Sequence, residues 1–193
     1  MNLANKLTML RVFMIPIFLV FLLGSFNNES LNKYIDVFGF IYQPMARHIA
    51  ILIFMSAALT DALDGHIARS RNMITNLGKF MDPVADKLLV CSALIAMVEL
   101  NILHAWVVIV IISRDFILMT FRMVASSNNV VIAADKIGKI KTAAQMVMII
   151  YLLFGFTAPT LVLVGNILIG IVIILTVLSA TSYVFKNLDV IKD

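Results

Sequence analysis

Residues 48–69 read HIAILIFMSAALTDALDGHIAR. The twelve residues between His48 and Asp61 are apolar or small, and as an α-helix they span about 18 Å. The hydrocarbon core of a membrane is about 30 Å thick, so a helix that enters it here carries Asp61 well inside. An ionisable group at such depth costs about 3 kcal/mol or more and is rarely present without a function. The stretch therefore predicts a membrane helix with a functional carboxylate.

The composition of the whole chain favours a membrane protein. Of its 193 residues, 62% are hydrophobic and 13% are charged, whereas soluble domains carry about 25% charged residues. The mean hydropathy is +1.02. The net charge of +4 favours contact with anionic lipid headgroups or phosphorylated substrates, and no nucleic-acid partner is expected. The length fits a single domain, residues 1–193.

The hydropathy pattern predicts an all-α integral membrane fold with six transmembrane helices. A span needs about 20 predominantly apolar residues. The six expected spans cover residues 8–26, 48–67, 81–100, 103–124, 140–158 and 161–185. The segment 27–47 is more polar, and its aromatic side chains suit the interface between membrane and water. We therefore expect this N-terminal segment to be interfacial.

The basic residues predict the orientation of the six spans. All of the 15 Lys and Arg residues except Lys33 and Arg47 fall on one side of the predicted membrane. Cytoplasmic loops are enriched in these residues, so both termini are expected in the cytoplasm. Asp86 and Arg114 lie about 16 Å and about 14 Å from the outer ends of their spans, a depth similar to that of Asp61. Three helices that become charged at one depth predict a polar chamber open to the cytoplasm.

Four carboxylates form the centre of the predicted site. Asp61 and Asp64 are three residues apart on one helix face, and Asp82 and Asp86 are four apart on one face of the next helix. The short connection between the helices makes them antiparallel neighbours, so the two pairs are expected to face each other. Carboxylates this close repel unless they are protonated or bridged by cations. All-oxygen ligation suits Mg²⁺ or Mn²⁺, and two such ions can clamp a phosphate or diphosphate group.

Small and basic residues accompany the carboxylates. Gly65 and Gly78 remove side chains beside them, so that a bulky ligand can approach the backbone closely. Ala68 adds another small position. Arg69 offers a planar set of donors that matches a phosphate group. Tight packing between membrane helices is the plainer explanation of Gly65.

The stretch between Asp61 and Asp86 resembles the signature of the CDP-alcohol phosphotransferase family, D-x2-D-G-x2-A-R-x8-G-x3-D-x3-D, at every specified position. The six predicted spans are also similar to that family's architecture. The resemblance implies that Asp61, Asp64 and Asp82 bind the divalent metals, and that Asp86 is the general base and also contacts a metal. It implies a site for the CDP group that is lined by Asn5, Thr8, Asp61, Gly65, Ala68, Arg69 and Gly78.

The reaction implied by this resemblance is transfer of a phosphatidyl group from CDP-diacylglycerol to an alcohol, with release of CMP. Three short patterns resemble one branch of the family, the phosphatidylglycerophosphate synthases, whose acceptor is glycerol 3-phosphate. The patterns are residues 5–11 (NKLTMLR), residues 113–115 (SRD) and residues 138–142 (GKIKT). The resemblance further implies a homodimer and a multi-pass location in a bacterial cell membrane.

Basic residues independently favour a phosphorylated acceptor. Arg114 and Arg122 are eight residues apart, on roughly one face of the fourth span, and Lys139 and Lys141 reach the same level from the start of the fifth. Convergent cations in a lipid-embedded chamber suit a dianion such as glycerol 3-phosphate, so these four residues are expected to bind the phosphate of the acceptor. Topogenic charge and contact with anionic lipids are the alternative explanation.

Several other functions fit part of the pattern. Inositol phosphate, serine and phosphatidylglycerol are alternative acceptors for the same chemistry, and the basic cluster argues against serine. Intramembrane carboxylates also occur along ion paths, so a divalent cation transporter is an alternative from another class. The acids gather at one face of the membrane with no charged residue in the outer half, which disfavours transport. A structural or regulatory membrane subunit is a third class.

Overall fold

The computed structural model describes residues 3–24, 28–37, 39–71, 76–127 and 136–186. Within these ranges, the side chains of residues 3–8, 61–71, 76–83, 86, 122–127, 136, 184 and 186 lie outside the description. The chain forms two compact units. The first unit contains residues 1–102 together with 152–157, and the second contains residues 103–151 and 158–193.

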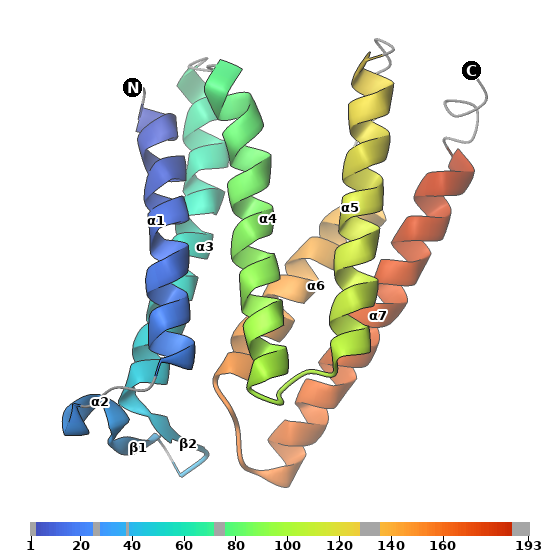
Figure 1. Cartoon of the computed structure of the whole chain (residues 1–193). Coiled ribbons are helices and arrows are strands. Elements are labelled where there is room, and N and C mark those ends of the chain that lie inside the picture. The colour runs from blue at the N-terminus through green and yellow to red at the C-terminus, as the bar shows by residue number, and fades with distance from the viewer. Residues whose placement is uncertain (1–2, 25–27, 38, 72–75, 128–135, 187–193) are drawn as a thin grey trace. The chain divides into compact units, whose positions relative to one another are not determined.

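Three long helices build the first unit (Figure 1). They are α1 (Leu3–Leu23), α3 (Met45–Arg71) and α4 (Asn76–Glu99). Each corresponds to one of the first three predicted spans, and each begins three to five residues earlier than predicted. The start of α1, the end of α3 and the start of α4 lie at the same end of the unit. The helices that carry the four aspartates are therefore antiparallel neighbours, as predicted.

Small residues allow these helices to pack closely. The side chains of Ala46, Ala50 and Ala57 on α3 are buried, as are those of Ala85 and Ala93 on α4. Between membrane helices, such residues let the backbones approach, and van der Waals contact then holds them together. Larger apolar side chains from α1 complete the packing, so the core of this unit follows one face of each helix.

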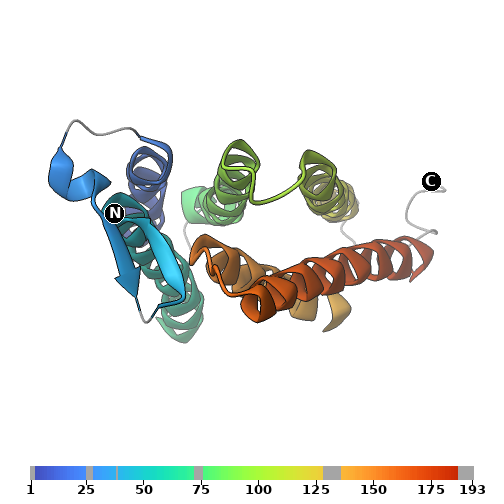
Figure 2. The ribbon, with the colours of Figure 1, turned by 90° about the horizontal axis from the view of Figure 1, so that it is seen from below.

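A small antiparallel hairpin precedes α3 and was not predicted. A short helix, α2 (Glu29–Asn32), leads into β1 (Tyr34–Val37) and β2 (Ile41–Pro44), with Gly39 at a φ of +73° in the turn. Side-chain exposure alternates along both strands, as in any strand that covers a core on one face. Figure 2 shows α2 and the hairpin gathered beside the ends of α1 and α3. The all-α prediction is therefore corrected at residues 34–44.

The segment after α6 pairs with this hairpin. Ile41 and Phe156 form an antiparallel bridge, and the Thr157 backbone N–H donates to the Phe40 carbonyl over 2.9 Å. The Thr157 hydroxyl donates to the same carbonyl over 3.1 Å. Gly155 makes the bend that brings these residues to the hairpin, with a φ of +61°. The outer edge of β2 is thus partly paired, which satisfies backbone groups that an edge strand leaves open.

Helix α4 ends in a Schellman motif. Asn101 adopts a left-handed conformation with a φ of +58°, which asparagine tolerates better than most residues. The Ile102 N–H donates to the Met97 carbonyl over 2.9 Å, and the Asn101 N–H donates to Val98 over 3.0 Å. These two bonds satisfy carbonyls at the end of the helix and fix where the chain leaves the first unit.

The second unit contains α5 (Ala105–Ser127), α6 (Lys136–Leu153) except for its last two residues, and α7 (Pro159–Lys186). They match the last three predicted spans, except that α6 ends five residues before the predicted end of its span. Pro159 opens α7, where the missing N–H of proline costs nothing because the first N–H groups of a helix have no partner within it. Tyr151 donates a hydrogen bond to the Leu161 carbonyl over 2.9 Å and ties the end of α6 to the start of α7.

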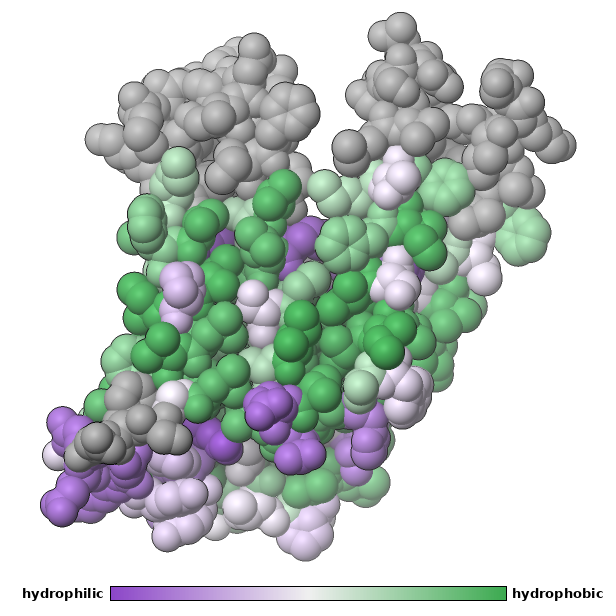
Figure 3. All heavy atoms as spheres, in the orientation of Figure 1, coloured by the Kyte–Doolittle hydropathy of each residue, from purple (hydrophilic) through white to green (hydrophobic). Residues whose placement is uncertain are grey.

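The outward faces of the helices are apolar. Figure 3 shows hydrophobic residues over the middle of the helices and hydrophilic residues near the hairpin. Exposed side chains include Phe13, Leu59, Ile95, Phe116 and Ile174. Within the described part of the chain, one helix is long and apolar enough to cross a membrane, at Pro159–Tyr183 with a mean hydropathy of 3.0. Of two shorter apolar segments, Met9–Leu23 begins at the first described side chain, and Met45–Thr60 ends at the last described side chain before residue 61. The surface suits a lipid environment.

Candidate active site

The four predicted metal ligands fall on two neighbouring helices. Asp61 and Asp64 lie within α3, and Asp82 and Asp86 lie within α4. Their side chains are outside the described part of the structure. The backbone therefore gives their place on each helix, while their predicted roles in metal binding and base catalysis stay predictions.

Helical periodicity places two of the aspartates on the packed face of α3. Ala50, Phe54 and Ala57 are all completely buried and follow one another at intervals of four and three residues. The next positions in the same progression are Asp61 and Asp64. Positions 61 and 64 therefore continue the line of buried apolar positions along α3.

Helix α4 shows the same change in the reverse direction along the chain. Ala85, Leu89 and Ala93 are buried at intervals of four residues, and Asp82 lies three residues before Ala85. Position 82 on α4 and positions 61 and 64 on α3 thus continue the lines of buried positions toward the start of α4 and the end of α3 (Figure 1). Carboxylate oxygens are the donors that Mg²⁺ and Mn²⁺ prefer, so this set of residues fits a divalent cation.

The other residues predicted around the CDP group also lie on the helices of the first unit. Asn5 and Thr8 are in the first turns of α1, and Gly78 is in the first turn of α4. The end of α3 contains Gly65, Ala68 and Arg69. All six lie where their side chains are outside the description, so only their positions on the helices are given.

Arg11 is a buried cation that was not predicted as a site residue. Its side chain is among the largest that are fully buried, with 1% of the residue exposed. It lies on α1 in one line with Ile15, Phe18 and Leu22, which are buried at successive intervals of four, three and four residues. A buried guanidinium requires anionic or carbonyl partners. Arg11 therefore adds a positive charge to the packed face that α1 contributes to the first unit.

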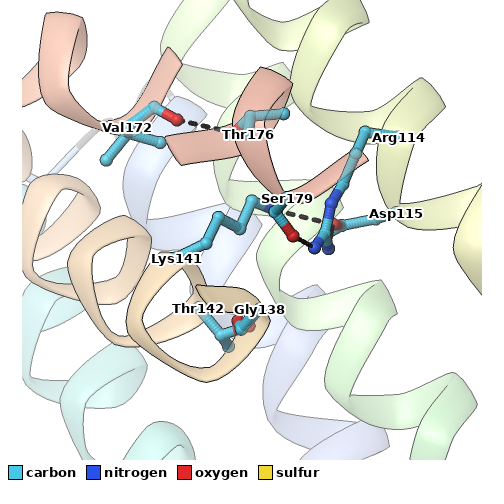
Figure 4. A network of polar contacts seen from close by, with 8 residues as sticks. All are labelled: Arg114, Asp115, Gly138, Lys141, Thr142, Val172, Thr176 and Ser179. Carbon is cyan, nitrogen blue, oxygen red and sulfur yellow. Dashed lines mark hydrogen bonds and ion pairs between the residues drawn. The ribbon is translucent and has the colours of Figure 1, made fainter. Parts of the chain in front are cut away.

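A cluster of charged side chains is buried in the second unit (Figure 4). Asp115 on α5 accepts two hydrogen bonds on its Oδ1 atom. Lys141 on α6 donates one from Nζ over 2.6 Å, and Arg114 donates the other from Nη1 over 2.9 Å. The exposed fractions of the Lys141, Arg114 and Asp115 side chains are 0%, 9% and 6%. One carboxylate thus joins two of the four cations predicted to bind the acceptor phosphate.

Helix α7 supplies a third partner to this cluster. The Arg114 Nη2 atom donates to the hydroxyl of Ser179, which is 1% exposed. Gly138 on α6 borders the same atoms, since a Cβ atom there would lie 3.5 Å from Arg114 Nη2 and 3.8 Å from Ser179 Oγ. Both terminal nitrogens of the Arg114 guanidinium therefore have hydrogen-bond partners. Because residue 138 is a glycine, no side chain from α6 occupies the space beside Nη2 at that position.

The other two predicted phosphate ligands are not part of the described network. Lys139 is exposed, whereas Lys141 is completely buried. Residues two apart on a helix point about 200° from each other, so the two lysines occupy opposite faces of α6. The side chain of Arg122, near the end of α5, lies outside the description. The roles of Lys139 and Arg122 stay predictions.

Two participants in the cluster were missed from the sequence. Asp115 follows Arg114 directly, and an acid beside an arginine inside a predicted span is a signal of a buried ion pair. Ser179 belongs to a long apolar helix, where small hydroxyl residues serve helix packing as often as polar contacts. The sequence held a signal for Asp115 and none that singled out Ser179.

Four aspartates on two neighbouring helices are the feature from which the class of enzyme was predicted, and comparison with known proteins tests that prediction. The chain belongs to the CDP-alcohol phosphatidyltransferase family, whose model matches residues 1–179. Among curated proteins, it is 39% identical to the CDP-diacylglycerol–glycerol-3-phosphate 3-phosphatidyltransferase of Bacillus subtilis (strain 168), over 99% of this chain and 97% of that protein.

Two further relatives have related names. The chain is 35% identical to the probable phosphatidylglycerophosphate synthase of Mycobacterium tuberculosis (strain ATCC 25618 / H37Rv), over 97% of this chain and 82% of that protein. It is 31% identical to the CDP-diacylglycerol–glycerol-3-phosphate 3-phosphatidyltransferase of Rickettsia felis, over 94% of this chain and 93% of that protein. The family predicted from residues 61–86 is therefore confirmed.

Proposed function

We propose that this enzyme transfers the phosphatidyl group of CDP-diacylglycerol to glycerol 3-phosphate, which yields phosphatidylglycerol phosphate and CMP. The observation that carries the choice of acceptor is the pair of buried cations, Arg114 and Lys141, around Asp115. An uncharged alcohol would not require two buried cations in one cluster, whereas a phosphate dianion would. The names of the relatives in Bacillus subtilis and Rickettsia felis support the same acceptor.

The donor side of the site lies on α1, α3 and α4. Asp61, Asp64, Asp82 and Asp86 would hold two divalent cations, Mg²⁺ or Mn²⁺, through carboxylate oxygens. When bound, these cations supply neutralising charge for the diphosphate of the donor and for the departing CMP. The six residues Asn5, Thr8, Gly65, Ala68, Arg69 and Gly78 would line the site for the CDP group.

The chemical step needs a base for the acceptor. Asp86 takes the proton from the attacking hydroxyl group of glycerol 3-phosphate. The oxygen then forms a bond to the phosphorus that carries the diacylglycerol. The bond from that phosphorus to the oxygen of CMP breaks, and CMP leaves with the electron pair. Positioning of the two substrates for the displacement supplies much of the acceleration.

The acceptor is held through its phosphate group. Arg114 offers a planar set of N–H donors, and Lys141 adds a compact positive charge beside it. Both lie in a buried environment, where the attraction between cation and phosphate is screened less than in water. The contributions of Lys139 and Arg122 are part of the proposal and rest on their basic side chains alone.

We also propose the arrangement of the enzyme in the membrane. Helices α1, α3, α4, α5, α6 and α7 form six spans, and the chamber that holds the aspartates opens to the cytoplasm, where both termini lie. The apolar outward faces of the helices and the one-sided distribution of Lys and Arg support this topology. The chain functions as one domain, residues 1–193, in the cell membrane and as a homodimer.

The test is release of CMP by the purified protein in detergent with CDP-diacylglycerol and Mg²⁺ or Mn²⁺. The acceptors to compare are glycerol 3-phosphate, inositol phosphate, inositol, serine and phosphatidylglycerol. Release that requires glycerol 3-phosphate is the expected result. Release that requires another acceptor would be consistent with the proposed role of the aspartates and would reject glycerol 3-phosphate as the acceptor. Folded protein that releases no CMP with any of them would favour the cation transporter, which proteoliposomes loaded with a metal-sensitive dye would reveal.

A further inference from the structure

The ion pairs of the second unit hold the Arg114 side chain in one orientation. Nη1 donates to Asp115 Oδ1, and Nη2 donates to the Ser179 hydroxyl. Two partners on the two terminal nitrogens fix both the position and the plane of the guanidinium. Because Asp115 is on the same helix and Ser179 is on α7, the plane is set by the packing of two helices.

One donor of the same guanidinium is unused. The Nε atom of Arg114 is buried and has no hydrogen-bond partner among the residues that the structure describes. A buried donor without a partner is costly, so a working protein usually provides one for such a group. A phosphate oxygen is the partner that an arginine donor matches best.

We propose that Asp115 and Ser179 are positioning residues that preorganise Arg114 and Lys141 for the phosphate of the acceptor. This inference rests on the proposed function, because it assigns these two residues to the acceptor side of that reaction. Asp115 sets the distance between the two cations, and Ser179 sets the rotation of the guanidinium. The enzyme then selects an acceptor that carries a phosphate by geometry as well as by charge.

The role of Asp115 can be separated from a simple charge effect. Arg114, Lys141 and Asp115 together carry a net charge of one positive unit, and removal of the carboxylate would raise it to two. If Asp115 only reduced the positive electrostatic potential around Arg114 and Lys141, its loss would strengthen binding of a dianion. If Asp115 positions the cations, its loss would weaken binding, since Lys141 would be buried without its carboxylate partner. The two roles predict changes of opposite sign.

Gly138 provides an independent test of where the phosphate enters. A methyl group at this position would make ordinary contact with Arg114 Nη2 at 3.5 Å and with Ser179 Oγ at 3.8 Å. Gly138→Ala therefore fits without displacing either atom. Gly138→Leu fills the volume beside the guanidinium, and we expect it to raise the KM for glycerol 3-phosphate more than Gly138→Ala does.

The decisive experiment measures KM and kcat for both substrates in Asp115→Asn, Asp115→Glu and Ser179→Ala. We expect Asp115→Asn to raise the KM for glycerol 3-phosphate by about tenfold or more, as for loss of a buried charge-assisted hydrogen bond. The KM for CDP-diacylglycerol should change by less than about twofold. Asp115→Glu should recover part of the loss, and Ser179→Ala should show a smaller effect of the same kind.

The matched control is Thr176→Val, one turn before Ser179 on α7. The Thr176 hydroxyl is buried and donates to the Val172 carbonyl of its own helix over 2.6 Å, so it holds no part of the cluster. Its kinetic constants should match those of the wild type. A lower KM for glycerol 3-phosphate in Asp115→Asn would overturn the positioning role, as would equal changes in the KM of both substrates.

Direct binding keeps the test independent of turnover. Glycerol 3-phosphate and inorganic phosphate should raise the melting temperature of the wild type and of Thr176→Val, and should do so far less in Asp115→Asn. Equal stabilisation of all three would refute the inference. Wild-type CMP release with an uncharged acceptor alone would instead reject the proposed function, so the two failures are distinguishable. If Asp115→Asn fails to fold, Ser179→Ala and the two Gly138 variants decide the question.

Discussion

Phe18 on α1 and Phe54 on α3 pack against each other with their ring centroids 5.5 Å apart, and both residues are completely buried. The two helices are antiparallel, so seven residues toward the start of α1 and seven toward the end of α3 cover about 10.5 Å in the same direction. These steps lead to Arg11 and Asp61, nearly on the faces of the two phenylalanines. Position 11 of α1 is therefore level with position 61 of α3, which holds the first aspartate of the predicted metal site.

Arg11 is expected to act on the donor side of the reaction. Replacement by Met keeps the length of the side chain and removes its charge, so the carboxylates at that level lose a neighbouring cation. We predict that Arg11→Met raises the KM for CDP-diacylglycerol about tenfold and changes the KM for glycerol 3-phosphate little. Arg11→Lys should recover part of the loss. An effect of Arg11→Met confined to glycerol 3-phosphate would contradict this assignment.

Asp86 is expected to be needed for turnover and dispensable for donor binding. Asparagine keeps the shape of the side chain and cannot accept the proton of the attacking hydroxyl group. Asp86→Asn should lower kcat by at least about 100-fold, the usual contribution of a general base. Equilibrium binding of CDP-diacylglycerol, followed by fluorescence of a labelled lipid, should persist. Turnover near that of the wild type would remove Asp86 from the role of base.

The remaining aspartates are expected to determine metal affinity. Loss of one carboxylate from a shared metal site should weaken binding of Mn²⁺ in Asp61→Ala, Asp64→Ala and Asp82→Ala. Electron paramagnetic resonance of Mn²⁺ titrated into the purified protein measures this without turnover. Asp36→Ala is the control, because Asp36 is an exposed residue of β1. Unchanged affinity in one of the three variants would exclude that residue from the ligands.

The two lysines at the start of α6 should differ in their effects. Lys141 is completely buried and paired with Asp115, so Lys141→Met leaves a buried carboxylate short of a cation and should raise the KM for glycerol 3-phosphate at least about tenfold. Lys139→Met changes an exposed charge that water and salt screen, so a smaller increase is expected. Measurement of the KM for glycerol 3-phosphate in both variants at several salt concentrations tests whether Lys141→Met has the larger effect. A larger effect of Lys139→Met would place the phosphate on the exposed face of α6.

Gly155 should be sensitive even to alanine. Its φ of +61° costs a residue with a side chain about 1–2 kcal/mol, and a Cβ atom would lie 3.1 Å from the Gln43 Oε1 atom. Gly155→Ala should therefore lower the melting temperature in detergent by several degrees. Gly170→Ala, on α7 where a Cβ atom has nothing within 4 Å, should leave it unchanged or raise it. Equal melting temperatures for the two variants would show that the bend at Gly155 contributes little to stability.

The long helices could be predicted from the sequence because hydropathy over about 20 residues is a strong signal. The hairpin could not, since its strands have only four residues each, which is too short for a clear periodicity in the sequence. Its pairing with Phe156 and Thr157 depends on contacts between residues far apart in the chain. Strands that depend on such contacts are difficult to predict, because the local sequence gives only a weak preference for strand.

The residues of the candidate site also fall into those that could be predicted from the sequence and those that could not. The spacing of Asp61, Asp64, Asp82 and Asp86 was sufficient to predict which helices carry the carboxylates, because i+3 and i+4 spacings determine a helix face. The cations were grouped by their level in the membrane, which placed Lys139 and Lys141 together. Helical periodicity separates those two residues, and only the packing of α5, α6 and α7 shows that Asp115 and Ser179 join the cluster.

The bond between Thr157 and the Phe40 carbonyl joins residues 117 positions apart. During synthesis, the ribosome has already made α3, α4, α5 and α6 when residue 157 is added to the chain. Until then, the Phe40 carbonyl lacks the two hydrogen bonds that it accepts from Thr157 in the folded protein. The hairpin therefore acquires this partner only when the turn before α7 has been made, so its pairing with Thr157 is a late step of biogenesis that precedes only α7 and the residues after it.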